Sequence, residues 1–296
     1  MQLTGVLIPV PTPFDERDRV DTTRFRRALE KWNARPLAGV VVLGSNGEAA
    51  LMDEFESDQA IVAAREVVPR ERHFIVGTGR ESTQAAIKAS KRAAEHGADA
   101  VLVRTPGFFK SQMTNDAFVR HYTAVADASP VPVLLYNFTA VTGVNLLPAA
   151  VARLATHPNI IGMKESGGDI AQIADLVSGT PPDFQVLAGS APTFYPALCV
   201  GVGGGILALG CVVPDACFRL FELFRAGRHD EAVALQRELV PLARLIGPMH
   251  GVPGLKAALN LLGYDVGVPR PPLGPVADAV IPVLREALAH FEEIPA

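Results

Sequence analysis

Lys164 is the residue whose place in the sequence points most directly to chemistry. Of the six lysines it alone lies in an apolar run, Ile160-Ile161-Gly162-Met163-Lys164. Lysine is almost never fully buried unless it is paired or functional. Apolar surroundings favour the neutral amine, which can attack a carbonyl carbon to form a Schiff base. An ion pair with the adjacent Glu165 is the alternative, although neighbouring strand residues point to opposite faces. Position alone leaves both roles open.

Two other sites also follow apolar runs. Tyr136 ends the run Val133-Leu134-Leu135-Tyr136, and a phenol beside a forming imine can pass protons. A core tyrosine bonded to the backbone is the alternative. The turn Gly44-Ser45-Asn46-Gly47-Glu48 follows another run and precedes a helical pattern. Its side chains and backbone N–H groups can bind a carboxylate, although ordinary turn geometry also explains its residues.

Several other classes of protein lack their signals in this sequence. No Cys/His spacing predicts a metal site, and there is no P-loop and no G-x-S-x-G turn. The net charge is −4, and without a basic run we expect no nucleic-acid partner.

We also expect no membrane span, signal peptide or disulfide framework. The uncharged stretch 191–214 is interrupted by Pro192, Pro196 and three glycines, so we predict a helix end and a buried strand there. The N-terminus has no charged region, and the three cysteines lie late in the chain in apolar surroundings, as small core residues do. These features predict a cytoplasmic protein.

Eight short apolar runs, rich in Val, Ile and Leu, alternate with helical patterns along the chain. The runs are 5–11, 40–44, 73–78, 100–105, 131–137, 160–165, 184–189 and 204–209. Their unbroken apolarity predicts strands buried on both faces, as in a parallel sheet. Helical patterns cover 53–68, 82–96, 114–128, 147–155, 169–178 and 214–226, and then 230–246, 254–262 and 275–290.

This alternation predicts an α/β fold, a (β/α)₈ TIM barrel over residues 1–226, with a C-terminal helical extension over 227–296 packed on the barrel. An open doubly wound sheet is the alternative, but its G-x-G-x-x-G turn after the first strand is missing. Barrel enzymes use the C-terminal ends of their strands. Lys164, Tyr136 and the turn 44–48 all lie at such ends.

Taken together, these motifs resemble the dihydrodipicolinate synthase / N-acetylneuraminate lyase superfamily over nearly the whole chain. The motifs are Gly5-Val6-Leu7 to Thr12-Pro13-Phe14, the turn 44–48, Gly77-Thr78-Gly79, Tyr136-Asn137 with Thr142-Gly143, and Gly162-Met163-Lys164-Glu165. The resemblance implies a (β/α)₈ barrel, usually a homotetramer, that forms a Schiff base with pyruvate or another 2-oxo acid and needs no metal or other cofactor.

Carried over residue by residue, the resemblance gives each site residue a role. Lys164 is the imine lysine, and Tyr136 is the proton relay, aided by Ser45. Ser45 and Asn46 bind the 2-oxo acid carboxylate. Gly189, Ser190 and Ile206 make further substrate contacts. Of these, Ser190 faces the second substrate and Ile206 lines the site.

Within the family, the chain is most similar to 4-hydroxy-2-oxoglutarate aldolases. The similarity rests on Gly-Ser-Asn-Gly-Glu at 44–48, Ser166-Gly167-Gly168-Asp169 and the segment 184–191. We therefore expect a lyase that cleaves a 4-hydroxy-2-oxo acid to pyruvate and an aldehyde. Dihydrodipicolinate synthesis from pyruvate and aspartate semialdehyde, or an aldolase or dehydratase reaction on a 2-oxo sugar acid, is the alternative. A 2-oxo acid binding protein without turnover is a third.

Two departures from the family pattern bear on this choice. The synthases carry an arginine that binds the aspartate semialdehyde carboxylate where Val141 stands here, and valine cannot pair with a carboxylate. The family often has paired tyrosines, one of them reaching the neighbouring subunit's proton relay, where this chain has Phe108 and Phe109. Phenylalanine cannot pass a proton, so three readings are open: water or the substrate completes the relay, turnover is reduced, or the chemistry differs.

Overall fold

The computed structural model describes residues 1–292 as a closed barrel of eight parallel strands. The strands are β1 (Gly5–Pro9), β2 (Gly39–Val42), β3 (His73–Gly77), β4 (Ala100–Arg104), β5 (Val133–Asn137), β6 (Ile160–Glu165), β7 (Gln185–Ala188) and β8 (Gly204–Ile206). β1 pairs with both β2 and β8, which closes the ring in chain order. The predicted (β/α)₈ fold is confirmed.

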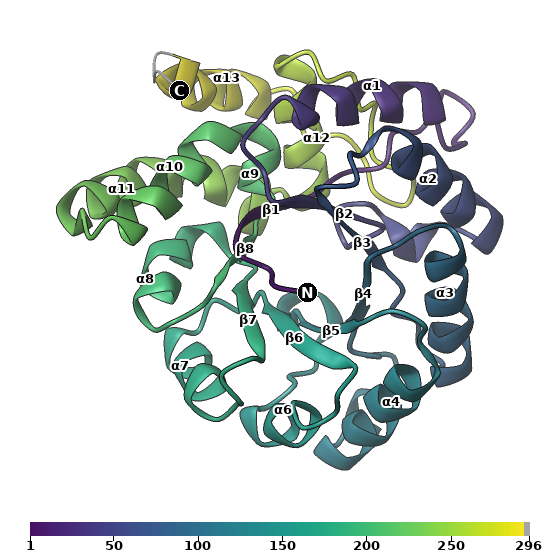
Figure 1. The fold of residues 1–296 in the computed structure, drawn as a ribbon. Coiled ribbons are helices and arrows are strands. Elements are labelled where there is room, and N and C mark those ends of the chain that lie inside the picture. Colours follow the sequence, from purple (N-terminus) through teal and green to yellow (C-terminus); the bar gives the residue numbers. More distant parts are fainter. Residues whose placement is uncertain (293–296) are drawn as a thin grey trace.

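Helices cover the outside of the ring (Figure 1). They are α1 (Thr22–Asn33), α2 (Glu54–Val67), α3 (Thr83–Glu95), α4 (Asn115–Ala128), α5 (Thr139–Thr142), α6 (Pro148–Leu154), α7 (Ile170–Ser178), α8 (Phe194–Cys199), α9 (Leu209–Val212) and α10 (Pro214–Arg225). Acidic and hydroxyl side chains begin several of them. Asp53 and Glu56 form a capping box on α2, for example, and Ser82 caps α3.

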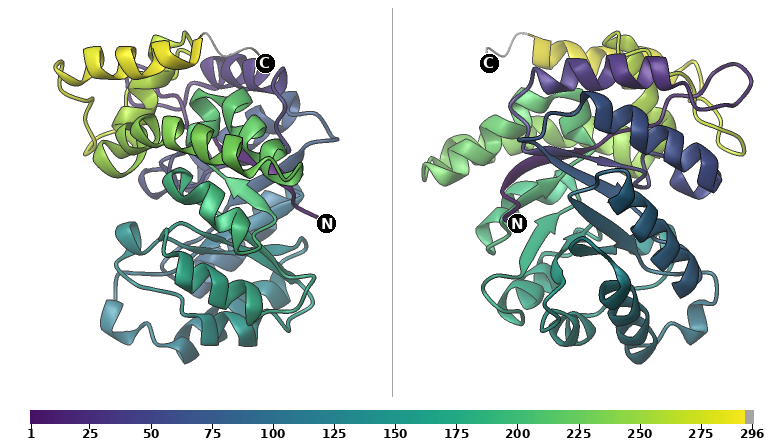
Figure 2. Two further views of the ribbon diagram at one scale, coloured as in Figure 1. Left: turned by 90° about the vertical axis from the view of Figure 1, so that its left-hand side faces the viewer. Right: turned by 45° about the vertical axis from the view of Figure 1, so that its right-hand side comes forward.

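The remaining helices are α11 (His229–Arg244), α12 (Gly251–Leu261) and α13 (Val280–Glu292), with a π-helical turn at Leu245–Met249 between α11 and α12. Figures 1 and 2 show α12 and α13 lying beside α1, on one side of the barrel. Buried contacts join this extension to the barrel, including the ion pair between Lys256 on α12 and Glu48 in the loop after β2.

Two apolar layers follow from the alternation of side chains along each strand. Leu7 faces the barrel interior, where it joins Val41, Leu187 and Ile206. Its neighbours Val6 and Ile8 face the helices and belong to the larger cluster between helices and sheet. Both faces of each strand are therefore buried, which explains the unbroken apolar runs.

Some sequence-based details were wrong. The helix α1 was not predicted, and β8 ends at Ile206 although its apolar run continues to residue 209. Cys211 and Cys217 are buried as expected, whereas Cys199 is exposed at the end of α8. The predicted pattern at 275–290 begins later, at Val280.

Candidate active site

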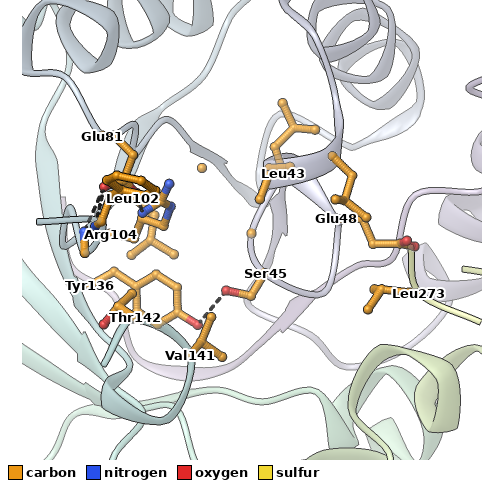
Figure 3. Close-up of a pocket in the computed structure, with 18 of the residues that line it drawn as sticks. Leu43, Ser45, Glu48, Glu81, Leu102, Arg104, Tyr136, Val141, Thr142 and Leu273 are labelled. Carbon is orange, nitrogen blue, oxygen red and sulfur yellow. Dashed lines mark hydrogen bonds and ion pairs between the residues drawn. The ribbon is translucent and has the colours of Figure 1, made fainter. Parts of the chain in front are cut away.

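A cavity of about 690 Å³ opens at the C-terminal ends of the strands. Ser45 and Gly44 follow β2, Gly77 ends β3, Arg104 ends β4, and Tyr136 is the penultimate residue of β5. Figure 3 shows Arg104 on one side of the cavity and Ser45 on another, with Tyr136 between them. This is the end of the barrel at which enzymes of this fold place their chemistry.

Lys164 lies against the ring of Tyr136 and is not itself among the residues that line the cavity. Its Nζ atom is 4.6 Å from the centre of the Tyr136 ring, and the two residues are direct partners in the β5–β6 ladder. Lys164 is 5% exposed and Tyr136 is 4% exposed. The Tyr136 hydroxyl is 3.3 Å from Ser45 Oγ, so Tyr136 contacts the Lys164 amine through its ring and the turn after β2 through its hydroxyl.

Glu165 turns away from Lys164. Its carboxylate accepts hydrogen bonds from Asn137 Nδ2 at 2.7 Å, from the Gly167 amide at 2.5 Å and from Gln172 Nε2 at 3.2 Å. Burial raises the pKa of Glu165, and these hydrogen bonds oppose the shift. Lys164 forms no ion pair within residues 1–292, so the paired, structural alternative finds no partner in the described chain.

The turn after β2 leaves two backbone donors unused within the described chain. The backbone amides of Ser45 and Asn46 have no hydrogen-bond acceptor among residues 1–292, whereas those of Gly47 and Glu48 close the turn. Glu48 adopts a left-handed conformation with φ 56°. Free N–H groups next to a hydroxyl can bind a carboxylate.

A buried ion pair holds this turn from behind. Lys256 Nζ lies 2.6 Å from Glu48 Oε1, and the other Glu48 oxygen accepts the Arg270 amide at 2.8 Å. Burial lowers the pKa of Lys256, although the Glu48 carboxylate opposes this. Sequence analysis missed this pair, because a lysine within an amphipathic helix gives no sign that its amine is buried.

The other residues singled out in the sequence lie at different distances from the cavity. Gly189 contacts Lys164 directly, since a Cβ atom there would lie 2.9 Å from Lys164 Cε. Ile206 is fully buried in the barrel interior together with Tyr136. Asn46 and Ser190 are half-buried and do not line the cavity.

The outer wall carries the residues in which this chain departs from the family pattern. Phe108 and Val141 both line the cavity, and they are 77% and 61% exposed. The ring of Phe109 meets that of Phe108 edge-on at 5.1 Å. The cavity mouth is therefore apolar where a tyrosine or an arginine was expected from the resemblance.

Arg104 and Glu81 also line the cavity, and sequence analysis did not single them out. Arg104 Nη1 donates to Glu81 Oε1 at 2.7 Å, and both side chains line the cavity. The signal was available, because Arg104 is a charged residue at the C-terminal end of an apolar run. Such placement is the criterion that singled out Lys164.

Two kinds of site are absent from residues 1–292. No group of three or more His, Cys, Asp or Glu side chains is arranged to hold a metal ion in this part of the chain. None of its helices combines the length and the apolar character that crossing a membrane requires.

The fold and the cavity together define a (β/α)₈-barrel enzyme with its site at the C-terminal ends of the strands. The model of the Dihydrodipicolinate synthetase family matches residues 2–291. The chain belongs to this family, and it is a carbon–carbon lyase or synthase as the family's members are. Schiff-base chemistry is a general property of the family.

Relatives within the family carry more than one name. The chain is 35% identical to a 4-hydroxy-tetrahydrodipicolinate synthase of Exiguobacterium, covering 98% of this chain and 99% of the relative. It is also 35% identical to a probable mitochondrial 4-hydroxy-2-oxoglutarate aldolase of Emericella nidulans, covering 98% and 95%. The chloride-inhibited dihydrodipicolinate synthase of Acinetobacter baumannii, solved with pyruvate, superposes with a TM-score of 0.93 at 28% identity, covering 99% and 100%.

Proposed function

We propose that this chain is a Schiff-base aldolase, without metal or other cofactor, that cleaves a 4-hydroxy-2-oxo acid such as 4-hydroxy-2-oxoglutarate. The products are pyruvate and an aldehyde such as glyoxylate. The supporting observation is the contact between the buried Lys164 amine and Tyr136, whose hydroxyl reaches Ser45. A single amine, a phenol and a hydroxyl then meet where a 2-oxo acid enters the barrel.

The reaction begins when the Lys164 amine attacks the C2 ketone and water leaves, which forms an imine. The protonated imine draws electrons from the C3–C4 bond as that bond breaks. Tyr136 accepts the proton of the C4 hydroxyl, and the aldehyde departs. Tyr136 then donates this proton to C3 of the enamine. Hydrolysis releases pyruvate and restores the free amine.

The C1 carboxylate of the substrate binds at the turn after β2. The Ser45 hydroxyl and the free amides of Ser45 and Asn46 are the donors. A carboxylate anchored there holds C2 next to Tyr136 and Lys164. Ser45 thereby serves both binding and, through its contact with the Tyr136 hydroxyl, proton transfer.

The experiment is borohydride reduction in the presence of pyruvate, followed by peptide mass mapping. We expect a reduced pyruvate adduct on Lys164, and neither adduct nor activity in Lys164→Arg. Lys256 is the internal control, because it is also buried but is paired with Glu48. An adduct on another lysine would contradict the role of Lys164. A folded protein that gives no adduct on any lysine would contradict the proposal and leave the binding-protein alternative.

Dihydrodipicolinate synthesis is the second candidate, and the name of the Exiguobacterium relative favours it. Val141 disfavours dihydrodipicolinate synthesis. Its apolar side chain lies in the cavity wall, at the position where the synthases carry their carboxylate-binding arginine. Parallel assays decide between the two. We expect release of pyruvate from 4-hydroxy-2-oxoglutarate to be faster than condensation of pyruvate with aspartate semialdehyde.

A further inference from the structure

Arg104 lies in one row with the two residues of the proposed chemistry. It is the direct ladder partner of Tyr136, which is in turn the partner of Lys164. Partners on adjacent parallel strands point to the same face, so all three side chains point into the barrel interior, on the side of Leu102 and Leu134. With strands about 4.8 Å apart, the backbones of Arg104 and Lys164 lie about 10 Å apart.

The Arg104 guanidinium is anchored on one side and free on the other. Its Nη1 atom donates to Glu81 Oε1 at 2.7 Å and to the Thr105 carbonyl at 3.2 Å. Its Nε and Nη2 atoms have no acceptor within the described residues, and the side chain is 26% exposed in the cavity wall. Two parallel donors therefore remain for a ligand.

Glu81 is itself fixed by backbone hydrogen bonds, so it can fix the orientation of the Arg104 guanidinium. Its second carboxylate oxygen accepts the backbone amides of Gly107 and Phe108, each at 2.9 Å. Burial alone would raise the pKa of Glu81, but the hydrogen bonds from these amides and from Arg104 outweigh it and lower the pKa. The pair stays ionised and oriented at neutral pH.

Gly79 supplies the space in which the Arg104 side chain lies. A Cβ atom at this position would be 2.4 Å from Arg104 Cγ and 2.4 Å from the Arg104 backbone nitrogen. The arginine stem therefore runs directly over bare backbone. This accounts for the second glycine of Gly77-Thr78-Gly79, a motif that the proposed chemistry does not otherwise use.

We propose that Arg104 binds the carboxylate on the aldehyde half of the substrate through Nε and Nη2. The substrate class is then a 4-hydroxy-2-oxo dicarboxylic acid, with one carboxylate at the turn after β2 and the other at Arg104. This inference rests on the proposed function. A planar guanidinium suits a carboxylate because it donates two parallel hydrogen bonds.

The test compares two substrates that differ only in the distal group. 4-Hydroxy-2-oxoglutarate carries the second carboxylate, and 4-hydroxy-2-oxopentanoate carries a methyl group in its place. In Arg104→Gln we expect kcat/KM for the dicarboxylate to fall roughly 10- to 100-fold, mainly through KM, the size of a lost charge-assisted pair. The value for the methyl analogue should stay unchanged.

Lys110→Gln is the matched control, because Lys110 is the other cation that lines the cavity and lies on the exposed loop after β4. If only the loss of positive potential mattered, kcat/KM for the dicarboxylate would fall equally in both variants. If Arg104 makes a specific contact, kcat/KM falls only in Arg104→Gln. An equal loss in both variants, or an equal loss for both substrates, would overturn the role of Arg104.

Pyruvate trapping separates this inference from the proposed function. Pyruvate has no distal carboxylate, so Arg104→Gln should form the Lys164 adduct as fast as the unaltered protein. Absence of the adduct in the unaltered protein contradicts the proposed function itself. If trapping is normal but aspartate semialdehyde is the substrate that loses turnover in Arg104→Gln, the dicarboxylate class is overturned.

Discussion

Gly189 shows how little room surrounds the Lys164 side chain. A Cβ atom at residue 189 would lie 1.9 Å from Ser166 Oγ and 2.9 Å from Lys164 Cε. We therefore expect Gly189→Ala to displace Lys164 and to lower kcat at least 100-fold, because a misplacement of about 1 Å can cost that much. Steady-state kinetics and the rate of pyruvate trapping measure the effect.

The control is the double variant Gly189→Ala/Ser166→Gly. Ser166→Gly removes the oxygen and the Cβ atom that the new methyl group meets, so part of the activity should return. Trapping at an unchanged rate in the single variant would show that Lys164 is not confined by Gly189.

At this scale, sequence reasoning found the residues with unusual positions and missed those with ordinary ones. Lys164 and Tyr136 stand out in apolar strands, and the structure brings them together with Ser45. Lys256 lies in an amphipathic helix, where a lysine is an ordinary residue. Its burial depends on the carboxylate of Glu48, 208 positions away in the chain. Tertiary pairing of that kind leaves no local pattern.

At the scale of the elements, α3 and α4 meet around a buried histidine. His121 on α4 lies with Nδ1 2.9 Å from Thr83 Oγ1 on α3, and its Nε2 atom is buried without a partner among the described residues. Burial lowers the pKa of His121 to about 4. The folded protein therefore keeps this ring neutral at pH values where the unfolded chain protonates it.

The sign of the pH dependence follows. Above pH 6.5, the ordinary histidine pKa, the ring is neutral in both the folded and the unfolded chain, so its titration does not affect stability. As the pH falls from 6.5 towards 4, the unfolded chain gains a proton that the folded chain does not, and the free energy of unfolding falls by about 3 kcal/mol. His121→Asn retains an acceptor for Thr83 without titrating.

Urea unfolding at pH 7.5, 5.5 and 4.5 measures this loss in both proteins. The variant should be less stable at pH 7.5, because it packs less well, yet its stability should fall less steeply towards pH 4.5. Parallel curves for the two proteins would show that other groups cause the acid sensitivity.

Element boundaries were harder to predict than elements. The end of a strand is hard to predict when the loop that follows it is also buried and apolar. Leu207, for example, is fully buried although β8 ends at Ile206. The missed α1 does carry a signal, since Phe25, Ala28, Leu29 and Trp32 are spaced to share one helical face and are buried.

At the scale of the whole molecule, the pair of Lys256 and Glu48 joins the C-terminal helices to the turn that bears Ser45. Both side chains are at most 1% exposed. Lys256→Met leaves a buried, unpaired carboxylate, so we expect the free energy of unfolding to fall by roughly 3–5 kcal/mol. Denaturant unfolding measures the loss, and a raised KM for the 4-hydroxy-2-oxo acid should accompany it because the turn moves.

The double variant Lys256→Met/Glu48→Gln is the control. Glutamine carries no charge and still offers an oxygen to the Arg270 amide, so most of the stability should return. If the double variant is no more stable than Lys256→Met, the loss comes from packing and not from the unpaired charge.

The exposed phenylalanines beside the cavity bear on assembly. Phe108 and Phe109 are 77% and 69% exposed on the loop after β4. We expect this loop to be covered in a homotetramer, so Phe108→Asp should shift sedimentation towards smaller species. Phe55→Asp on α2 is the control, because Phe55 is 70% exposed but lies apart from this loop in the sequence. A monomeric unaltered protein would contradict the expectation.

Closure of the ring between β1 and β8 has a consequence during translation. Leu7 must wait for Ile206, about 200 residues further along the chain, before its ladder is complete. At 5–20 residues per second that interval lasts roughly 10–40 s. Throughout it, the nascent chain presents an unpaired edge that other chains can join. We therefore expect the ribosome-bound chain, in which this edge is unpaired, to be more prone to aggregation than the closed barrel.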